Sequence, residues 1–260
     1  MTDRINELRK QSLEATNTIS AERAILVTDF YATGIDREVS VAVMRAMTLD
    51  YILSNKFICI NDQELIVGER GPAPKATPTY PEINLHTIDD LEILDARKKV
   101  SFKVFEETKQ VYREKIIPFW KGKSNRERIM RTMNQEWHDA YKAGIFTEFQ
   151  EQRAPGHTVA GDKIYKKGML DIIEDIHNSI SSLDYSNDPF AYDKEEELKA
   201  MEIAARAIIQ FANRHADKLT ELAKTRYASH VTRYADLMEM ARICRKVPTY
   251  APETFHEALQ

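Results

Sequence analysis

The chain has 260 residues and a mass of 30.0 kDa, enough for a substantial hydrophobic core in one or two domains. Its formal net charge of -4 provides no basic field for nucleic acid, and no apolar run of about 18 residues predicts a membrane span. The charged start MTDRINELRK does not resemble a signal peptide, and two cysteines favour a reducing, cytoplasmic compartment over a disulfide scaffold.

Apolar spacing in the first part of the chain is typical of helices. One helix begins with Ile5 and Leu8, a second runs from Ser20 as N-cap to Gly34, and a third has its apolar face between Val39 and Leu53. The spacing of the apolar residues then changes. Apolar residues 57–60 and 65–67 flank the polar residues 61–64, which predicts two short strands joined by a turn. The proline-rich stretch 71–81 predicts an ordered loop without regular structure, packed through Tyr80.

Helical patterns dominate again from Thr87 onward. Pro118 and Gly122 predict a helix break, and Ser124 followed by Glu127 is a capping-box pattern that opens the next helix. The spaced residues Trp137, Tyr141 and Ile145 predict a core-facing stripe. Three further helices are expected over residues 167–183, 194–224 and 229–245. The fold class predicted from these patterns is mainly α with a few short strands.

Motifs for cofactors are absent from the sequence. There is no His-x-x-x-His, no Cys-x-x-Cys and no glycine-rich phosphate loop, so neither a metal nor a nucleotide cofactor is expected. The run Glu195–Glu197 is interpreted as a solvated helix start, where negative charge complements the helix dipole.

The most informative segment is FTEFQEQRAPGHTVAGD, residues 146–162. Pro155 fixes φ and Gly156 permits a left-handed turn, so His157 would be presented from a defined backbone. A histidine held in this way can donate a hydrogen bond to a substrate hydroxyl or transfer a proton near neutral pH. Arg153 offers a planar fork of donors for a carboxylate or for loop carbonyls. The structural alternative is that Arg153 ties two loops together and His157 is a buried, hydrogen-bonded core histidine.

Five segments resemble those of glycyl radical enzymes in the pyruvate formate-lyase superfamily, specifically its dehydratase-like branch. They are INDQELIVGERGPAPKATPTYPE, IIPFWKGKSNRERI, QRAPGH, GDKIYKKGMLDI and VPTYAPETFHEALQ. The resemblance covers nearly the whole chain. It implies that residues 1–260 form the N-terminal part of a ten-stranded α/β barrel.

The residues that carry the radical in this family have no match here. Cys59 and Cys244 lack the following glutamate of the thiyl-radical cysteine, and each is interpreted as a small apolar residue. None of the 8 glycines lies in an RVxGY-like motif. The resemblance therefore implies an N-terminal portion without the thiyl cysteine loop and the C-terminal glycyl radical domain, inactive on its own. It also implies that this portion binds no cofactor and that a radical S-adenosylmethionine activating enzyme installs the radical in the remainder. The full-length enzyme would be a homodimer acting on a small molecule.

Within the branch, the segment 146–162 together with APETFHEALQ most resembles enzymes that remove water from trans-4-hydroxy-L-proline to give a pyrroline-5-carboxylate. By position, His157 matches the histidine that hydrogen-bonds the substrate hydroxyl, and Phe149 matches the aromatic residue that packs on the substrate ring. Arg153, Pro155 and Gly156 would support the loop. Two alternatives remain: a sibling lyase acting on glycerol, propanediol or another small hydroxylated substrate, and a non-catalytic helical interaction domain.

Overall fold

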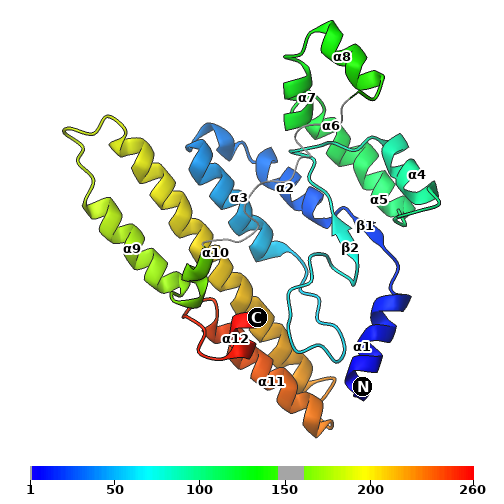
Figure 1. The fold of residues 1–260 in the computed structure, drawn as a ribbon, viewed down its shortest axis with the longest axis vertical. Helices are drawn as coiled ribbons and strands as arrows, with labels where there is room; N and C mark the ends of the chain where they lie inside the picture. Colours follow the sequence, from blue (N-terminus) through cyan, green and yellow to red (C-terminus); the bar gives the residue numbers. More distant parts are fainter. Residues whose placement is uncertain (1, 146–160) are drawn as a thin grey trace.

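The computed structural model describes residues 2–145 and 161–260, and this part of the chain is mainly helical, as predicted (Figure 1). The α-helices are α1 (Asp3–Glu14), α2 (Glu22–Ala32), α3 (Val41–Asn55), α4 (Ile88–Ala96), α5 (Glu106–Val111), α6 (Ile117–Trp120), α7 (Asn125–Met130), α8 (Gln135–Lys142), α9 (Met169–Ser181), α10 (Ala191–Lys224), α11 (Val231–Lys246) and α12 (Phe255–Leu259). Two strands, two 3-10 turns and one π-helical turn complete the described elements: β1 (Thr18–Ser20), β2 (Ala76–Pro78), η1 (Ile35–Arg37), η4 (Gly161–Tyr165) and η2 (Tyr112–Ile116). Within these described ranges, no helix combines the length and apolarity needed to cross a bilayer.

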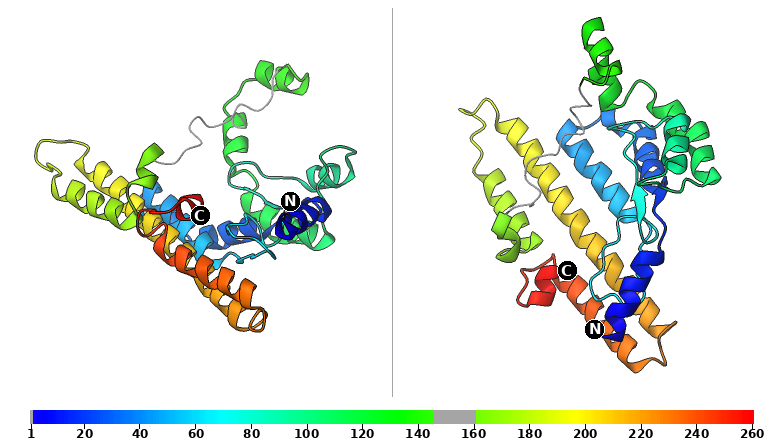
Figure 2. Two further views of the ribbon diagram at one scale, coloured as in Figure 1. Left: turned by 60° about the horizontal axis from the view of Figure 1, so that its bottom comes forward. Right: turned by 45° about the vertical axis from the view of Figure 1, so that its right-hand side comes forward.

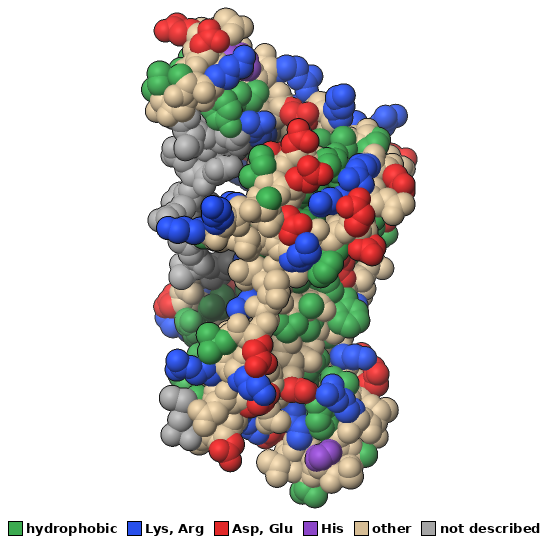
Figure 3. All heavy atoms as spheres, turned by 90° about the vertical axis from the view of Figure 1, so that its right-hand side faces the viewer, with side chains coloured by type: hydrophobic (Ala, Val, Ile, Leu, Met, Phe, Trp, Pro, Cys, Tyr) green, Lys and Arg blue, Asp and Glu red, His purple; other side chains and the backbone are tan. Residues whose placement is uncertain are grey.

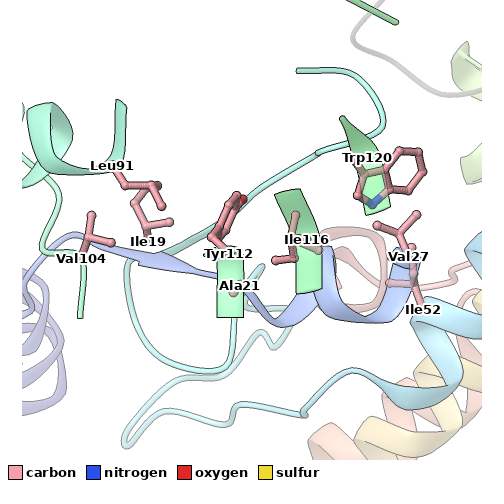
Figure 4. Close-up of a cluster of buried hydrophobic side chains, with 10 residues drawn as sticks. Ile19, Ala21, Val27, Ile52, Leu91, Val104, Tyr112, Ile116 and Trp120 are labelled. Carbon is pink, nitrogen blue, oxygen red and sulfur yellow. The ribbon is translucent and has the colours of Figure 1, made fainter. Parts of the chain in front are cut away.

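The first packing unit is built around α2 and the short parallel pair of β1 and β2, in which Thr18 is opposite Ala76. Its core contains Ile19, Ala21, Ala24, Val27, Ile52, Leu91, Val104, Tyr112, Ile116 and Trp120. In Figure 4 this cluster extends from Leu91 and Val104 at one end to Trp120 and Val27 at the other. Two buried hydrogen bonds fix the aromatic members: Trp120 Nε1 donates to Thr28 at 2.8 Å, and the Tyr112 hydroxyl donates to Thr79 at 2.6 Å. Burial raises the pKa of Tyr112 to about 12, so the phenol stays protonated and can act as this donor.

The second packing unit is organised by the long helix α10. Helices α3, α9 and α11 all pack against it, and Figure 2 shows α9 and α11 lying along different parts of its length. The core between α10 and α11 contains Val67, Ala216, Leu219, Ala223, Leu237, Met240, Ala241 and Cys244. Arg214 of α10 reaches across to donate to the carbonyl oxygens of Leu53 and Lys56. Because those carbonyls lie at the C-terminal end of α3, this arginine joins the two packing units at the point where α3 ends.

The predicted strands over 57–60 and 65–67 are wrong, since neither stretch forms a strand and residues 65 and 66 lie in a bend. Their backbone groups are satisfied by side chains instead. Arg233, buried in α11, donates to the carbonyls of Asn61 and Glu64 at 3.1 and 2.8 Å. The Gln260 amide accepts from Val67 N–H at 2.9 Å and donates to Val67 C=O at 3.0 Å, as a neighbouring strand would. Side chains from α11 and from the end of α12 therefore supply the hydrogen bonds that a neighbouring strand would have supplied.

Three local predictions near turns also need correction. Ser20 lies in β1 rather than at the N-cap of α2, although its hydroxyl accepts from Glu22 N–H at 3.3 Å. The stretch 71–81 is not wholly irregular, because residues 76–78 form β2. The helix does not break at Pro118: the π-turn η2 precedes it, and Pro118 falls in the first turn of α6, where no N–H donor is needed.

The predicted core stripe on α8 is also wrong. Trp137 is 52% exposed and Ile145 is 76% exposed, and α8 buries no residue. Tyr141, the third residue of the stripe, is half-buried and accepts a hydrogen bond from Arg126, so the stripe as a whole does not face a core.

Several helix boundaries match their predictions closely. The Ser124 hydroxyl caps α7 by accepting from Glu127 N–H at 3.2 Å. The three helices expected over 167–183, 194–224 and 229–245 appear as α9, α10 and α11. Glu195 and Glu196 form ion pairs with Lys199 near the start of α10, consistent with a solvated helix start.

An ion pair ties the proline-rich stretch to α2. Arg23 donates to the two carboxylate oxygens of Glu82 at 2.5 and 3.1 Å, and its guanidinium lies 3.9 Å from the centre of the Tyr80 ring. The same guanidinium donates to Thr79 C=O at 3.3 Å. Both charged side chains are about one-fifth exposed, at 20% and 21%. The planar fork of arginine matches a carboxylate in this two-bond geometry, which a lysine cannot reproduce.

We expect Arg23→Met to lower the free energy of unfolding of this chain by about 1.5–3 kcal/mol, because a half-buried charged acceptor loses its donors. The loss of unfolding free energy for Arg23→Lys should be smaller than for Arg23→Met but not zero, since lysine keeps the charge and lacks the planar fork of donors. The matched control is Arg113→Met: Arg113 pairs with Glu106 at 2.6 Å, but both side chains are well exposed, so the loss should stay below about 1 kcal/mol. Urea denaturation of the purified chain measures all three. Equal losses at the two arginines would show that the Arg23 pair is an ordinary surface contact.

Exposed apolar side chains gather where the start of α9 meets the segment leading into α12. Leu170 N–H donates to Thr249 C=O, and around this contact Tyr165, Leu170, Tyr250 and Phe255 are 56%, 40%, 56% and 80% exposed. On the face seen in Figure 3, apolar side chains also lie between the charged groups, and neither sign of charge covers it alone. Large apolar side chains exposed in this way are typical of a contact face when they form one patch.

We therefore expect the 260-residue chain to self-associate or to bind a hydrophobic dye, measured by light scattering and dye fluorescence. Changing Tyr250 and Phe255 together to serine should reduce dye binding, because it removes the two large rings of this surface. Leu13→Ser in α1 is the control, since Leu13 is 72% exposed but lies in a helix that buries no residue. A monodisperse chain that binds no dye would contradict the expectation.

Candidate functional site

The residues predicted to form the site all fall in one segment outside the described part of the chain. Phe149, Arg153, Pro155, Gly156 and His157 lie within 146–160. The described structure ends at Ile145 on one side of this segment and resumes at Gly161 on the other. It therefore describes the framework from which the segment leaves and to which it returns.

On the N-terminal side, the framework consists of α7 and α8. Asn134 caps α8 by accepting from Trp137 N–H at 3.0 Å, and Gly144, with φ of 71°, ends the helix while its N–H donates to Tyr141 C=O. Arg126 of α7 donates to the Tyr141 hydroxyl at 2.9 Å. Although α8 buries no residue, its caps and the charge-assisted hydrogen bond from Arg126 both help to hold it.

Helix α7 is in turn held by the end of the proline-rich stretch. The N–H groups of Asn125 and Arg126 donate to the carbonyls of Glu82 and Ile83 at 2.9 and 3.0 Å. Because the carboxylate of Glu82 is bound by Arg23, the chain of contacts runs from α2 through Glu82 to α7 and α8. The N-terminal end of the predicted site segment therefore depends on the first packing unit.

On the C-terminal side, the segment returns through η4 to the start of α9. The N–H groups of Met169 and Leu170 donate to Pro248 and Thr249 C=O at 2.8 and 3.2 Å, and Gly168 N–H donates to the Asp171 carboxylate at 2.8 Å. Two backbones meet here at the first turn of a helix, where N–H groups have no partner within the helix. This end of the segment depends on the second packing unit.

The segment preceding Arg70 is held by both α11 and α12. Besides the contacts of Arg233 and Gln260, His256 Nε2–H donates to Leu65 C=O at 2.8 Å. Glu64 accepts from the Asn61 N–H and side-chain amide at 2.7 and 3.1 Å, and burial raises the pKa of this carboxyl group. The segment that carries part of the family resemblance is thus fixed by side chains from the last two helices.

Neither cysteine has the surroundings of a reactive thiolate. Burial raises the pKa of Cys244 to about 11, and burial together with the charges of Glu64 and Glu69 raises that of Cys59 to about 11. Cys244 is a member of the α10–α11 core, as predicted for a small apolar residue, whereas Cys59 is only half-buried. Among the residues that the structure describes, no group of three or more His, Cys, Asp or Glu side chains is arranged to hold a metal ion.

The sequence indicated the Ser124 cap of α7 but did not single out Arg23, Glu82 or Gly168. Arg23 and Glu82 are 59 positions apart and carry no local signal of their pairing. Gly168 lies in the segment GDKIYKKGMLDI, which was recognised only by its resemblance to the family. Its place directly before an apolar, helical run was the one local sign that two backbones approach closely there.

Comparison with known proteins identifies the family of this chain. A family model described as pyruvate formate lyase-like matches residues 1–260. The chain is 44% identical over 258 residues to trans-4-hydroxy-L-proline dehydratase of Clostridioides difficile, covering 99% of this chain and 32% of that enzyme.

Two solved structures share the fold. A crystal structure of hydroxyproline dehydratase from Clostridioides difficile, with its substrate trans-4-hydroxy-L-proline bound, matches with a TM-score of 0.92 and 44% identity over 99% of this chain and 32% of that one. The glycerol-bound form of the B12-independent glycerol dehydratase from Clostridium butyricum matches with a TM-score of 0.89 and 32% identity, again over 99% and 32% of the two chains. This chain spans about a third of the length of these relatives. With the family model matched from end to end and the fold shared with solved members, the chain belongs to the pyruvate formate lyase-like family.

Proposed function

We propose that this chain is the N-terminal portion of a glycyl radical dehydratase that removes water from trans-4-hydroxy-L-proline. The observation that carries the proposal is the 44% identity to the hydroxyproline dehydratase of Clostridioides difficile, which extends over 99% of this chain with a TM-score of 0.92. Because the chain spans about a third of that enzyme, the activity belongs to a protein of the relatives' full length. Residues 1–260 would be the first part of its pyruvate formate-lyase-like domain, and the enzyme is a carbon–oxygen lyase.

His157 is the proposed catalytic residue of this portion. In the dehydration, the substrate loses its hydroxyl group and one hydrogen as water and leaves as a pyrroline-5-carboxylate. A hydroxyl leaves readily only when it is protonated or strongly hydrogen-bonded, and an imidazole can do either near neutral pH. We assign His157 to this hydrogen bond and Phe149 to packing against the substrate ring. Arg153, Pro155 and Gly156 would hold the loop that carries them.

The radical chemistry would reside outside residues 1–260. A protein glycyl radical, installed by a radical S-adenosylmethionine activating enzyme, would supply hydrogen-atom abstraction through a cysteine when the whole enzyme is assembled. No position of this chain matches either radical residue. We further propose that the enzyme is a cytoplasmic homodimer with a small-molecule substrate. The two free cysteines, Cys59 and Cys244, support the reducing compartment.

A sibling activity on glycerol or propanediol is the second candidate. It is favoured by the match to glycerol dehydratase, with a TM-score of 0.89, but the identity there is 32% against 44% for the hydroxyproline enzyme. A non-catalytic helical interaction domain has less support, because the family model covers residues 1–260 and the matched solved structures are enzymes.

We expect the 260-residue chain alone to have no dehydratase activity and to form no glycyl radical, because it contains neither a Cys-x-Glu nor an RVxGY-like sequence. The measurement is anaerobic incubation with a radical S-adenosylmethionine activating enzyme, followed by electron paramagnetic resonance and a product assay. A full-length homologous dehydratase treated in parallel shows that the activation works. A glycyl radical doublet from the isolated chain would refute the assignment.

In the full-length enzyme, His157→Gln should lower turnover by roughly 10²–10⁴-fold, because glutamine can hydrogen-bond the hydroxyl but cannot deliver a proton. Phe149→Ala should instead weaken substrate binding by roughly 1–3 kcal/mol, the value of a buried apolar contact. Both variants should still accept the glycyl radical, which electron paramagnetic resonance quantifies. Steady-state kinetics with trans-4-hydroxy-L-proline and with glycerol separate the candidates. Near-normal turnover of His157→Gln would return His157 to a structural role, and a preference for glycerol would favour the sibling lyase.

A further inference from the structure

A groove beside the turn that joins α6 to α7 is lined by positively charged side chains (Figure 1). Its volume is about 520 Å³, and its lining residues are Gly122, Lys123, Arg128, Arg131 and Thr132. All five are exposed to solvent. None of the described Asp or Glu side chains lines this basic groove. In a chain with a formal net charge of -4, three cations around one hollow concentrate positive charge locally.

Two of the three cations are held in place by partners that carry no charge. The Lys123 ammonium lies 3.9 Å from the centre of the Phe119 ring, and Arg131 donates to Gly122 C=O. A ring face and a carbonyl oxygen orient a cation without neutralising it. The Arg128 guanidinium has no hydrogen-bond or ion-pair partner among residues 2–145 and 161–260. The groove therefore presents three uncompensated positive charges, two of them already oriented.

The nearest acidic side chain along the chain is engaged elsewhere. The Glu127 carboxylate accepts from Gly122 N–H at 3.0 Å and from the Ser124 hydroxyl at 2.7 Å. It lines a separate cavity of about 290 Å³ and not the basic groove. These two bonds close the turn that carries Lys123, so Glu127 shapes the groove without occupying it.

The dipole of α7 accounts for only part of this charge. Arg128 and Arg131 lie in the last turn and at the C-cap of α7, where a cation is favourable. Lys123 directly precedes Ser124, the N-cap, and a cation is unfavourable at that end of a helix. What the three residues share is the groove that they line.

We propose that the basic groove binds the phosphate group of a small phosphorylated molecule. The planar fork of arginine matches phosphate oxygens in two parallel hydrogen bonds, and a lysine adds a point charge. A phosphate ester carries close to two negative charges and three strong acceptor oxygens, which suits three cations better than a single carboxylate does. The groove volume falls in the range of about 300–1,000 Å³ that is usual for small-molecule sites. This inference does not depend on the dehydratase function proposed above.

The test is isothermal titration calorimetry of the purified 260-residue chain at low ionic strength, where surface charges are least screened. The probes are phenyl phosphate, inorganic phosphate and benzoate. Phenyl phosphate should bind saturably, and benzoate, with one negative charge on the same ring, should bind at least about 10-fold more weakly. Raising the salt concentration should weaken the binding of phenyl phosphate.

Two double variants that remove equal charge locate the site. Arg128→Gln with Arg131→Gln should weaken phenyl phosphate binding roughly 10–100-fold, the size expected for lost charge-assisted hydrogen bonds. Lys98→Gln with Lys99→Gln is the control, since both lysines are exposed in the segment after α4, and the affinity should stay within about 2-fold. Urea denaturation shows whether each variant folds. If the arginine pair does not fold, Arg128→Gln alone serves, because Arg128 has no partner to lose within the described ranges.

The outcomes are distinct. Saturable binding that is lost in the groove variants and kept in the lysine control supports the inference. Tighter binding of phenyl phosphate than of inorganic phosphate identifies an ester as the ligand, and equal affinities identify the free ion. No saturable binding, equal weakening in both double variants, or equal affinity for benzoate overturns the inference. None of these results bears on the dehydratase assignment, which radical formation and turnover test separately.

Discussion

The two-bond ion pair between Arg23 and Glu82 is the interaction on which the N-terminal half depends. It joins α2, whose inner face is part of the first core, to a stretch whose prolines leave few backbone donors of its own. The carbonyls of Glu82 and Ile83 then receive the first N–H groups of α7, and Arg126 of α7 holds α8. A charged group one-fifth exposed is costly to leave unpaired, so this contact selects one arrangement of loop and helix.

The C-terminal side of the predicted site is fixed by a different kind of contact. There the start of α9 is held against the turn at 248–250 by the close approach of Gly168 and by backbone hydrogen bonds to Pro248 and Thr249. The closest atoms at this contact are uncharged backbone atoms. The 15 residues between the described ranges are therefore attached to two packing units, one at each end. Arg214 joins these units through the end of α3, so the spacing of the two attachments is set inside this chain.

The parts of the fold set by local sequence were predictable, and those set by distant partners were not. The long helix α10 and the Ser124 cap follow from periodicity and capping within a few residues. Residues 57–60 and 65–67 are short apolar runs typical of strands, but whether Val67 pairs with a strand or with the amide of Gln260 depends on a residue 193 positions away. The spacing of Trp137, Tyr141 and Ile145 predicted a core face, but Trp137 and Ile145 are exposed, because a local pattern does not state where a face packs. For the site, the role of His157 was inferred from the segment itself and stays a prediction, whereas the contacts of Glu82 and Gly168 could be found only from three-dimensional proximity.

The central claim is that His157 binds the departing hydroxyl of trans-4-hydroxy-L-proline. A crystal structure of the full-length enzyme with this substrate bound tests it most directly. We predict a ring nitrogen of His157 within about 2.6–3.2 Å of the 4-hydroxyl oxygen, with the Phe149 ring against the pyrrolidine. A structure in which His157 hydrogen-bonds only to protein groups, while another residue holds the hydroxyl, would contradict it.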